Sequence, residues 1–243
     1  GCLLNLFFLK NVMTGSFKFS LAILRNVFSI GWPAGVLQVF WQLSVLALFL
    51  IISALPENNI EILAAFTNGL KIESVIFLPA FAFNMSSAVV VGNLLGKNSQ
   101  EDAFSAGIVT ALAGVMIVSA LTVMVMCNGP AAAALISNND IVIRESIRYI
   151  YIALLSEPIM AWGVILAGGL NGAGDTRRVM AAVVLSVWLV RVPLSYLLGV
   201  YFKLGAPAIW WSMNISVTLQ AILITKRYFS KKWFVCKHVE PVA

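Results

Sequence analysis

Charged residues are scarce in this sequence. Only 11% of its 243 residues are Asp, Glu, Lys or Arg, whereas 60% are hydrophobic, and the mean hydropathy is +0.94. A soluble domain of this length carries charge on about a quarter of its residues. The scarcity of charge therefore excludes an ordinary soluble domain and predicts an integral membrane protein.

Histidine and cysteine are almost missing as well. The single histidine, His238, lies in a basic C-terminal stretch, and the three cysteines, Cys2, Cys127 and Cys236, are far apart. This spacing fits neither a disulfide framework nor a zinc site. We therefore expect no metal and no cofactor. An enzyme is not expected either, because no nucleophile, base and orienting group occur together on one side of the membrane.

Long uncharged runs take the place of charged surface. Residues 74–96, 103–139 and 204–225 carry no formal charge, and a helix that crosses a bilayer needs about 20 apolar residues. Runs such as SVLALFLIISAL are apolar on every face, unlike the alternating strands of a membrane barrel. The sequence predicts an all-α integral membrane fold with six transmembrane helices, at about residues 31–55, 62–93, 104–127, 146–168, 179–201 and 206–226.

Amphipathic and basic stretches flank the predicted spans. The opening GCLLNLFFLKN is too short an apolar run to cross a bilayer and resembles the end of a preceding span. The next stretch, SFKFSLAILRNVFSI, has the one-sided apolar pattern of a helix that lies along the membrane surface. The expected divisions are a linker region at 1–30, a six-helix lobe at 31–227 and a basic cytoplasmic tail at 228–243.

Successive loops of a six-helix chain lie on alternate sides of the membrane, and most of the lysines and arginines fall in the loops and chain ends of one side. Because positive loops are retained in the cytoplasm, both chain ends are expected there, with the helices in the plasma membrane. This side holds Lys10, Lys18, Arg25, Lys97, Arg177, Arg178, Lys226, Arg227, Lys231, Lys232 and Lys237. The net charge of +6 then reflects topology and contact with anionic lipid, so no nucleic-acid partner is expected.

The stretch GGLNGAGDTRR at 168–178 has two interpretations. A phosphate-binding loop would join a strand to a helix and carry a lysine after its glycines, as in GxxxxGK[ST]. This stretch joins two predicted membrane helices and has no such lysine. The favoured interpretation is a structural turn, in which Gly172 and Gly174 allow a tight reversal and Asp175 or Thr176 caps the next helix.

Three stretches together resemble one family of transporters. EPIMAWGVILAGGLNGAGDTRR resembles a helix and loop of multidrug and toxic compound extrusion (MATE) transporters. GWPAGVLQVFWQL resembles the first helix of a repeat in that family, and KIESVIFLPAFAFNMSSAVVVGNLLGKNSQEDA resembles its second helix and exit loop. The resemblance covers about residues 17–230 and implies the C-terminal six-helix lobe of a twelve-helix, two-lobe transporter.

The resemblance also implies a function, the secondary active efflux of amphipathic or cationic drugs and toxic compounds in exchange for Na⁺ or H⁺. Partners would then be these small molecules, membrane lipid, and an N-terminal lobe or a second copy of this one. Two alternatives stay open. One is a transporter that flips a lipid or a lipid-linked sugar, and the other is a membrane fragment that transports nothing.

Ionisable residues within the spans are the first candidates for transport. Glu157 leads, because the following Pro158 removes a helix hydrogen bond and frees nearby carbonyl oxygens for an ion or water. A structural carboxylate is the alternative. Lys71 and Glu73 are two residues apart and so do not share a helical face. Arg191 is expected to snorkel or to meet Glu157 or Glu73.

Uncharged polar residues are the second group of candidates. Gln38 and Gln42 share a face of the first span and Asn84 lies in the second, although hydrogen bonds between helices explain all three more simply. Many relatives carry a glutamate near the two glutamines and an aspartate near Met160, and this sequence has neither. These two absences weaken the transfer of a sodium site from the family to this chain. Met160 is a further candidate, for the lining of an adaptable substrate pocket, with ordinary packing as the simpler explanation.

Overall fold

The computed structural model describes residues 21–235 of the chain. The chain divides into two compact units, Gly1–Trp32 and Pro33–Ala243. The second unit contains all the contacts discussed below.

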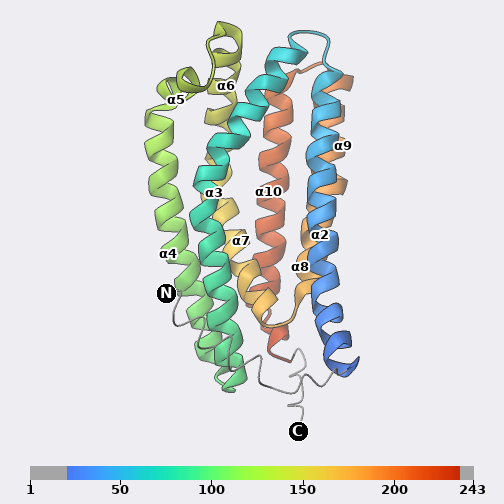
Figure 1. Ribbon diagram of the computed structural model, residues 1–243, viewed down its shortest axis with the longest axis vertical. Coiled ribbons are helices and arrows are strands. Elements are labelled where there is room, and N and C mark those ends of the chain that lie inside the picture. The colour runs from blue at the N-terminus through green and yellow to red at the C-terminus, as the bar shows by residue number, and fades with distance from the viewer. Residues whose placement is uncertain (1–20, 236–243) are drawn as a thin grey trace, which may run out of the picture. The chain divides into compact units, whose positions relative to one another are not determined.

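Helices make up almost all of the second unit (Figure 1). In chain order the α-helices are α2 (Leu21–Ser53), α3 (Asn59–Gly96), α4 (Gln100–Cys127), α5 (Gly129–Ile136), α6 (Asp140–Ala153), α7 (Glu157–Gly172), α8 (Thr176–Leu185), α9 (Val192–Tyr196) and α10 (Ala206–Phe229). Two 3-10 segments, η1 (Leu154–Ser156) and η4 (Lys232–Val235), and two π-helical segments, η2 (Ser186–Arg191) and η3 (Leu197–Tyr201), adjoin them.

Six helices of the described chain are long and apolar enough to cross a membrane. They are Gly31–Ser53, Asn59–Gly96, Gln100–Cys127, Asp140–Gly172, Thr176–Tyr201 and Ala206–Phe229. The predicted all-α membrane fold with six spans is therefore confirmed. Two of the spans are composite, because α6, η1 and α7 follow one another without a loop, as do α8, η2, α9 and η3.

The expected division between a linker region and the six-helix lobe stays a prediction. Residues 21–30 belong to α2 (Leu21–Ser53), which has Pro33 inside it. At the other end, the expected basic tail begins with packed residues, because Tyr228 and Trp233 are both fully buried. The preceding-span pattern at the start, His238 and the rest of the tail lie outside the described residues.

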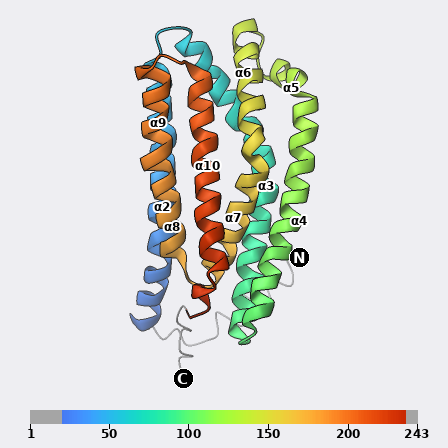
Figure 2. The ribbon, with the colours of Figure 1, turned by 180° about the vertical axis from the view of Figure 1, so that it is seen from behind.

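The basic turns lie at one end of the second unit. The α3–α4 turn, the α7–α8 turn and the end of α10 meet at the bottom of Figures 1 and 2, and the α9–α10 loop and the start of α6 lie at the top. The lower segments include Lys97, Arg177, Arg178, Lys226 and Arg227. The arrangement brings together the turns that the charge pattern assigned to one side of the membrane.

Glycines let α7 approach α3 along the lower half of the bundle. Gly168 and Gly172 lie against the backbone carbonyl oxygens of Asn84 and Ala88, and a methyl group at either glycine would collide with them. Asn84 also donates a hydrogen bond from Nδ2 to the Val164 carbonyl at 2.6 Å. Small residues permit such close contact between membrane helices.

Aromatic side chains close this end of the bundle. Tyr228 of α10 reaches over Gly107 of α4, where a larger residue would collide with its hydroxyl, and that hydroxyl donates to the Phe104 carbonyl at 3.0 Å. Trp233 folds back onto Tyr228, with ring centroids 5.0 Å apart, and its Nε1 donates to the Tyr228 carbonyl at 2.7 Å. The chain after the last span is thereby part of the core.

The α7–α8 turn reverses the chain as expected, but its aspartate has a different role. Gly174 has φ 82°, the left-handed conformation that glycine adopts freely, and its N–H donates to the Asn171 carbonyl at 3.0 Å. Asp175 precedes α8, yet its side chain makes no capping hydrogen bond. Its carboxylate pairs instead with Nε of Arg227 at 2.5 Å, so it joins the turn to α10.

Candidate functional site

Three ionisable side chains lie well inside the spans and close to one another. Glu157 begins α7 and is 6% exposed, Arg191 ends η2 and is 3% exposed, and Glu73 of α3 is half-buried. Glu73 interacts electrostatically with both Glu157 and Arg191. We call these three residues the charged cluster. They come from three different spans, which only the fold brings together.

Glu73 is held by an aromatic side chain that the sequence did not point to. The Tyr149 hydroxyl donates to Oε1 of Glu73 at 2.7 Å. The Tyr149 ring occupies the space over Gly69, one turn before Glu73, and meets the Trp210 ring edge-on at 4.7 Å and that of Phe66 at 5.7 Å. The missing side chain at Gly69 thus gives Tyr149 room to reach the carboxylate.

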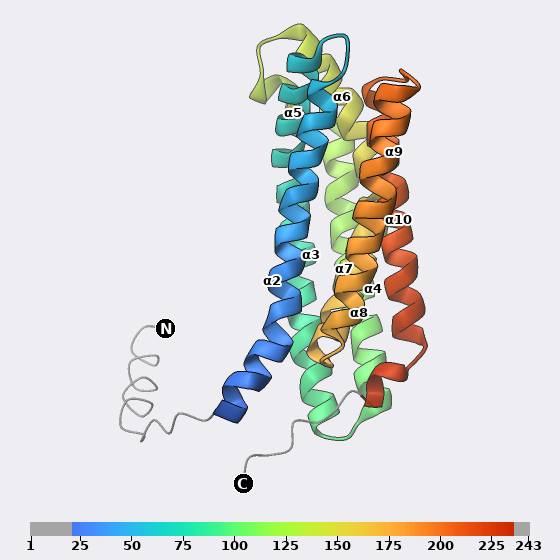
Figure 3. The same cartoon turned by 90° about the vertical axis from the view of Figure 1, so that its right-hand side faces the viewer.

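Arg191 lies against α2. Its guanidinium carbon is 5.1 Å from the ring centroid of Trp41, a distance at which the cation is attracted to the ring face. Beside this contact, Nε1 of Trp188 donates to the Phe40 carbonyl at 3.3 Å. Figure 3 shows α2 alongside the α8–α9 helix that carries Arg191. Arg191 makes no direct ion pair with a carboxylate of the described residues.

Irregular helices surround the cluster. Glu157 follows the 3-10 segment η1, and Arg191 is the last residue of the π-helical segment η2. Such π-helical turns occur frequently at functional sites. Proline explains part of the irregularity, since Pro158 and Pro193 both lack the N–H that an α-helix needs. Glu157 and Arg191 therefore lie where two composite spans change their helical type, whereas Glu73 lies within the regular helix α3.

Carbonyl oxygens beside Pro158 were expected to be free for an ion or water. In the structure three of them have donors: the Ile152 carbonyl accepts from Asn214, the Ala153 carbonyl from Ser156 and the Leu154 carbonyl from the N–H of Glu157. Each of these oxygens therefore has a hydrogen-bond donor despite the proline. Because a carbonyl oxygen has two lone pairs, its contact with an ion or water stays a prediction. The Glu157 carboxylate itself remains the candidate group.

Three buried polar atoms near the cluster have no hydrogen-bond partner among the described residues. They are Oε2 of Glu157, Nε of Arg191 and Nε1 of Trp210. An unpaired buried polar atom costs about 1–3 kcal/mol, and an unexplained one calls for a partner such as water or an ion. With both carboxylates ionised, the cluster holds two negative charges and one positive charge. One proton or one monovalent cation would balance it.

Within the described residues, no hydrogen bond or ion pair joins the other candidate residues to the charged cluster. Gln38 and Gln42 are exposed on α2, and Lys71 is exposed on α3, away from the face that buries Glu73. Asn84 makes the hydrogen bond between helices described above. Met160 is half-buried on α7. The turn residues Gly172, Gly174, Asp175 and Thr176 belong to the lower end of the bundle.

Sequence reasoning missed Tyr149, Trp41 and Asn214. Tyr149 and Trp41 look like ordinary membrane aromatics, and nothing local distinguishes them. Asn214 had a usable signal, because it is an amide in the middle of a long uncharged span, where polar side chains are costly unless they have partners.

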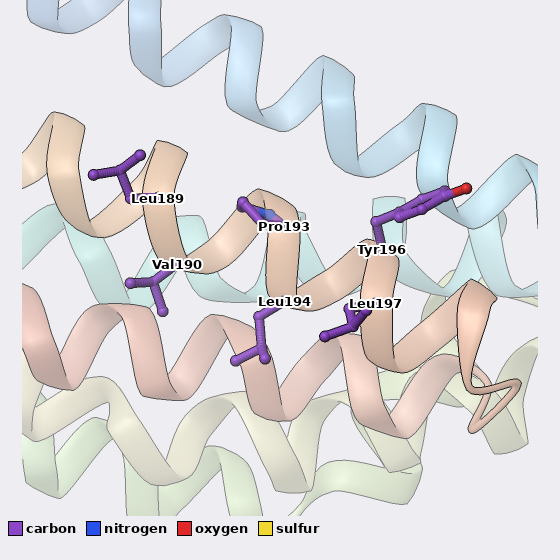
Figure 4. A pocket seen from close by; sticks show the side chains of 6 residues that line it. All are labelled: Leu189, Val190, Pro193, Leu194, Tyr196 and Leu197. Carbon is purple, nitrogen blue, oxygen red and sulfur yellow. The ribbon is translucent and has the colours of Figure 1, made fainter.

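An apolar pocket lies on the surface of the same composite span that carries Arg191. It is lined by Leu189, Val190, Pro193, Leu194, Tyr196 and Leu197 (Figure 4). Its lining includes no charged side chain, and Arg191 does not contribute to it. The pocket is therefore separate from the charged cluster.

The chain is similar in sequence to a protein family and to several known proteins. A family model described as MatE matches residues 33–197. A probable multidrug resistance protein NorM of Burkholderia pseudomallei is 27% identical over 87% of this chain and 46% of its own length. The multidrug resistance protein PmpM of Pseudomonas aeruginosa is 28% identical over 89% of this chain and 46% of its own length. The chain thus spans less than half the length of these relatives.

Solved structures share the fold. The MATE transporter ClbM, determined in complex with Rb⁺, has a TM-score of 0.82 and 19% identity, covering 94% of this chain and 52% of its own. A MOP superfamily transporter from Pyrococcus furiosus has a TM-score of 0.81 and 19% identity, covering 89% of this chain and 49% of its own. Each matches this chain with about half of its length.

Proposed function

Because the chain belongs to the MATE family of membrane transporters, we propose that it forms one six-helix lobe of an efflux transporter. The lobe acts with an N-terminal lobe or a second copy, and together they export amphipathic or cationic drugs and toxic compounds in exchange for Na⁺ or H⁺. The observation that supports ion coupling most directly is the buried charged cluster, with an unpartnered carboxylate oxygen on Glu157.

Glu157 is the proposed coupling residue. Its Oε2 accepts a proton or contacts Na⁺, which balances the excess negative charge of the cluster. Ion binding favours one conformation of the two-lobe transporter and substrate binding favours the other, so that the shared cavity opens alternately to each side of the membrane. Glu73 and Arg191 set the electrostatic surroundings in which Glu157 exchanges its ion.

The proposed orientation follows from the basic turns. The α3–α4 and α7–α8 turns and the end of α10 face the cytoplasm, as do both ends of the chain, because lysine and arginine are retained on that side. The proposed location is the plasma membrane, where export removes a compound from the cell. Anionic lipid head groups would contact the same basic turns.

Export of a fluorescent organic cation from cells that lack their own pumps tests this proposal. The chain is expressed alone and with any coding sequence that precedes it in the same reading frame. Export by the chain alone indicates pairing with itself, and export only with the preceding sequence indicates a two-lobe protein. If neither exports, the transporter of lipids or lipid-linked sugars and the membrane protein that transports nothing become the better explanations.

Replacing Glu157 with glutamine in the exporting form tests the coupling residue. We expect Glu157→Gln to abolish the dependence of export on the Na⁺ or H⁺ gradient. The matched control is Glu145→Gln, in the same composite span but paired with Arg148 near its outer end, which should leave that dependence unchanged. Undiminished ion-coupled export by Glu157→Gln would exclude Glu157 as the coupling residue.

A further inference from the structure

The regular α-helical hydrogen bonds are interrupted at η1, between α6 and α7, and we call this place the break. Other donors replace the missing hydrogen bonds there. Pro158 has no N–H to offer the Leu154 carbonyl, and the N–H of Glu157 takes that place. In a regular helix that N–H would bond the Ala153 carbonyl, which instead accepts from Oγ of Ser156 at 3.1 Å. The Leu154 and Ala153 carbonyls thus both keep a hydrogen-bond donor, although neither donor is the one that a regular α-helix would supply.

Asn214 of α10 bridges this break with both atoms of its amide. Nδ2 donates to the Ile152 carbonyl at 2.6 Å, and Oδ1 accepts from Oγ of Ser156 at 2.9 Å. Ile152 precedes the 3-10 segment and Ser156 ends it. The Asn214 side chain is buried, with the residue 7% exposed. One side chain therefore ties both ends of the irregular segment to a neighbouring helix.

The same face of α10 also supports the second carboxylate. Trp210 lies four residues before Asn214, which places both on one side of the helix. Its ring packs edge-on against Tyr149 at 4.7 Å, and Tyr149 donates to Glu73. Two residues one turn apart on α10 therefore support the two carboxylates indirectly. Asn214 holds the segment that precedes Glu157, and Trp210 packs against Tyr149, which binds Glu73.

We propose that Asn214 is a positioning residue for Glu157. By holding Ile152 and Ser156, it sets the place of the next residue, Glu157, relative to Glu73 and Arg191, and it links any movement of α10 to the ion site. This inference rests on the proposed function of Glu157. An amide suits the position because it donates and accepts at once and adds no further charge beside the two carboxylates.

Transport in reconstituted vesicles tests the role of Asn214, with the complete exporting form of the protein. The initial rate of organic-cation transport is measured against Na⁺ concentration, with K⁺ as the replacement ion, and against pH without Na⁺. Asn214→Leu keeps the branching of the side chain at Cγ but removes both hydrogen bonds. We expect it to raise the half-saturating concentration of the coupling ion about tenfold, as the loss of groups that orient ion ligands typically does, with little change in the maximal rate.

Two further variants separate positioning from general packing. Ser156→Ala removes only the hydroxyl half of the bridge and should shift the half-saturating concentration in the same direction by less. Thr225→Val is the matched control, because it removes another hydrogen bond between α10 and α7, from Nε1 of Trp162 at 2.9 Å, away from the break. It should leave the half-saturating concentration unchanged, even where its thermal stability falls as much as that of Asn214→Leu.

Three outcomes overturn the inference. One is a half-saturating concentration in Asn214→Leu equal to that of Thr225→Val. The second concerns the case in which Asn214→Leu does not fold. The inference then fails if Ser156→Ala leaves the half-saturating concentration of the coupling ion unchanged. The third is undiminished ion dependence in Glu157→Gln, which excludes Glu157 as the coupling residue and so removes the premise of this inference. Loss of ion dependence in Glu157→Gln without a shift in the Asn214 and Ser156 variants overturns only the role of Asn214.

Discussion

The two ends of α7 lie in contrasting surroundings. Toward its end, Gly168 and Gly172 pack directly against the backbone of α3. At its start, Glu157 follows an irregular segment and carries a buried oxygen without a partner among the described residues. Close backbone packing characterises one end, which we call the glycine-packed end, whereas unbalanced charge characterises the other. Under the proposed function, ion-dependent changes begin at the charged cluster rather than at the glycine-packed end.

Side-chain partners sharpen the same contrast. At the glycine-packed end, Asp175 pairs with Arg227 and the indole of Trp233 donates to the Tyr228 carbonyl. In the charged cluster, Arg191 contacts the face of Trp41 rather than a carboxylate. A charge that is not tied into a direct pair is freer to respond when the charge of a neighbour changes. The following changes should affect stability at one end and transport at the other, in decreasing order of size.

Replacing Trp233 with alanine should have the largest effect on stability. The side chain is fully buried against Tyr228, and removal of a buried tryptophan costs about 3–5 kcal/mol. Thermal unfolding of the detergent-solubilised protein, followed by size-exclusion chromatography, measures the loss. Trp211→Ala is the control, since Trp211 is 48% exposed and should matter much less. Equal losses for the two variants would mean that the segment after α10 is not part of the core.

Adding a methyl group at Gly168 should be next. The new carbon would collide with the Asn84 backbone, which can move only with its helix, so we expect Gly168→Ala to lose about 2–3 kcal/mol of stability. The same substitution at Gly96 meets nothing within 4 Å and should be neutral or stabilise by up to about 1 kcal/mol. Thermal unfolding of the two variants under identical conditions compares them directly. Similar behaviour of both would contradict close backbone packing at α7.

Glu157→Gln should reduce transport without reducing stability, the opposite of the substitutions at the glycine-packed end. It removes a buried charge that has no direct partner, so unfolding temperature should stay the same or rise, while the rate of ion-driven export falls tenfold or more, equivalent to about 1.4 kcal/mol. Parallel measurements of unfolding temperature and export on the same preparation check both parts. A variant that loses stability and export together would indicate a structural role for this carboxylate.

The ion pair between Asp175 and Arg227 should have the smallest effect. Its carboxylate side chain is 8% exposed and its guanidinium side chain 23% exposed, so the coupling between Asp175→Asn and Arg227→Gln should reach about 1 kcal/mol. A double-mutant cycle on thermal stability measures it. The more exposed pair of Lys231 with Glu101 serves as comparison and should give a smaller value. A larger coupling in the exposed pair would contradict the role of burial.

Several features of the fold could be predicted because they depend on neighbouring residues only. Six spans follow from the length and hydropathy of each run, and the grouping of basic turns follows from their alternation along the chain. The reversal at Gly174 follows from the freedom of glycine at positive φ. The partner of Asp175 did not follow, because Arg227 lies far away in the sequence and displaced the expected helix cap.

The candidate site was only partly accessible from the sequence. Glu157, Glu73 and Arg191 could be named because charge inside a span is rare, but their meeting depends on how three spans pack. Tyr149 carries no local mark of its role. Asn214 is marked as a polar residue in an uncharged span that needs partners, but the sequence does not say which partners those are. The carbonyl oxygens beside Pro158 illustrate the limit, since proline reliably removes a donor but only the neighbouring helix decides whether another donor replaces it.

By itself, the sequence determined that this protein lies in the membrane as α-helices, because every backbone group in lipid needs a partner and an apolar run finds its partners within its own helix. It also determined where the chain turns. Only the tertiary structure decided which charges meet, which polar atoms stay unpartnered and how Asn214 bridges the break before Glu157. Those features depend on distances between helices, which are set by glycine contacts and aromatic packing among residues far apart in the chain.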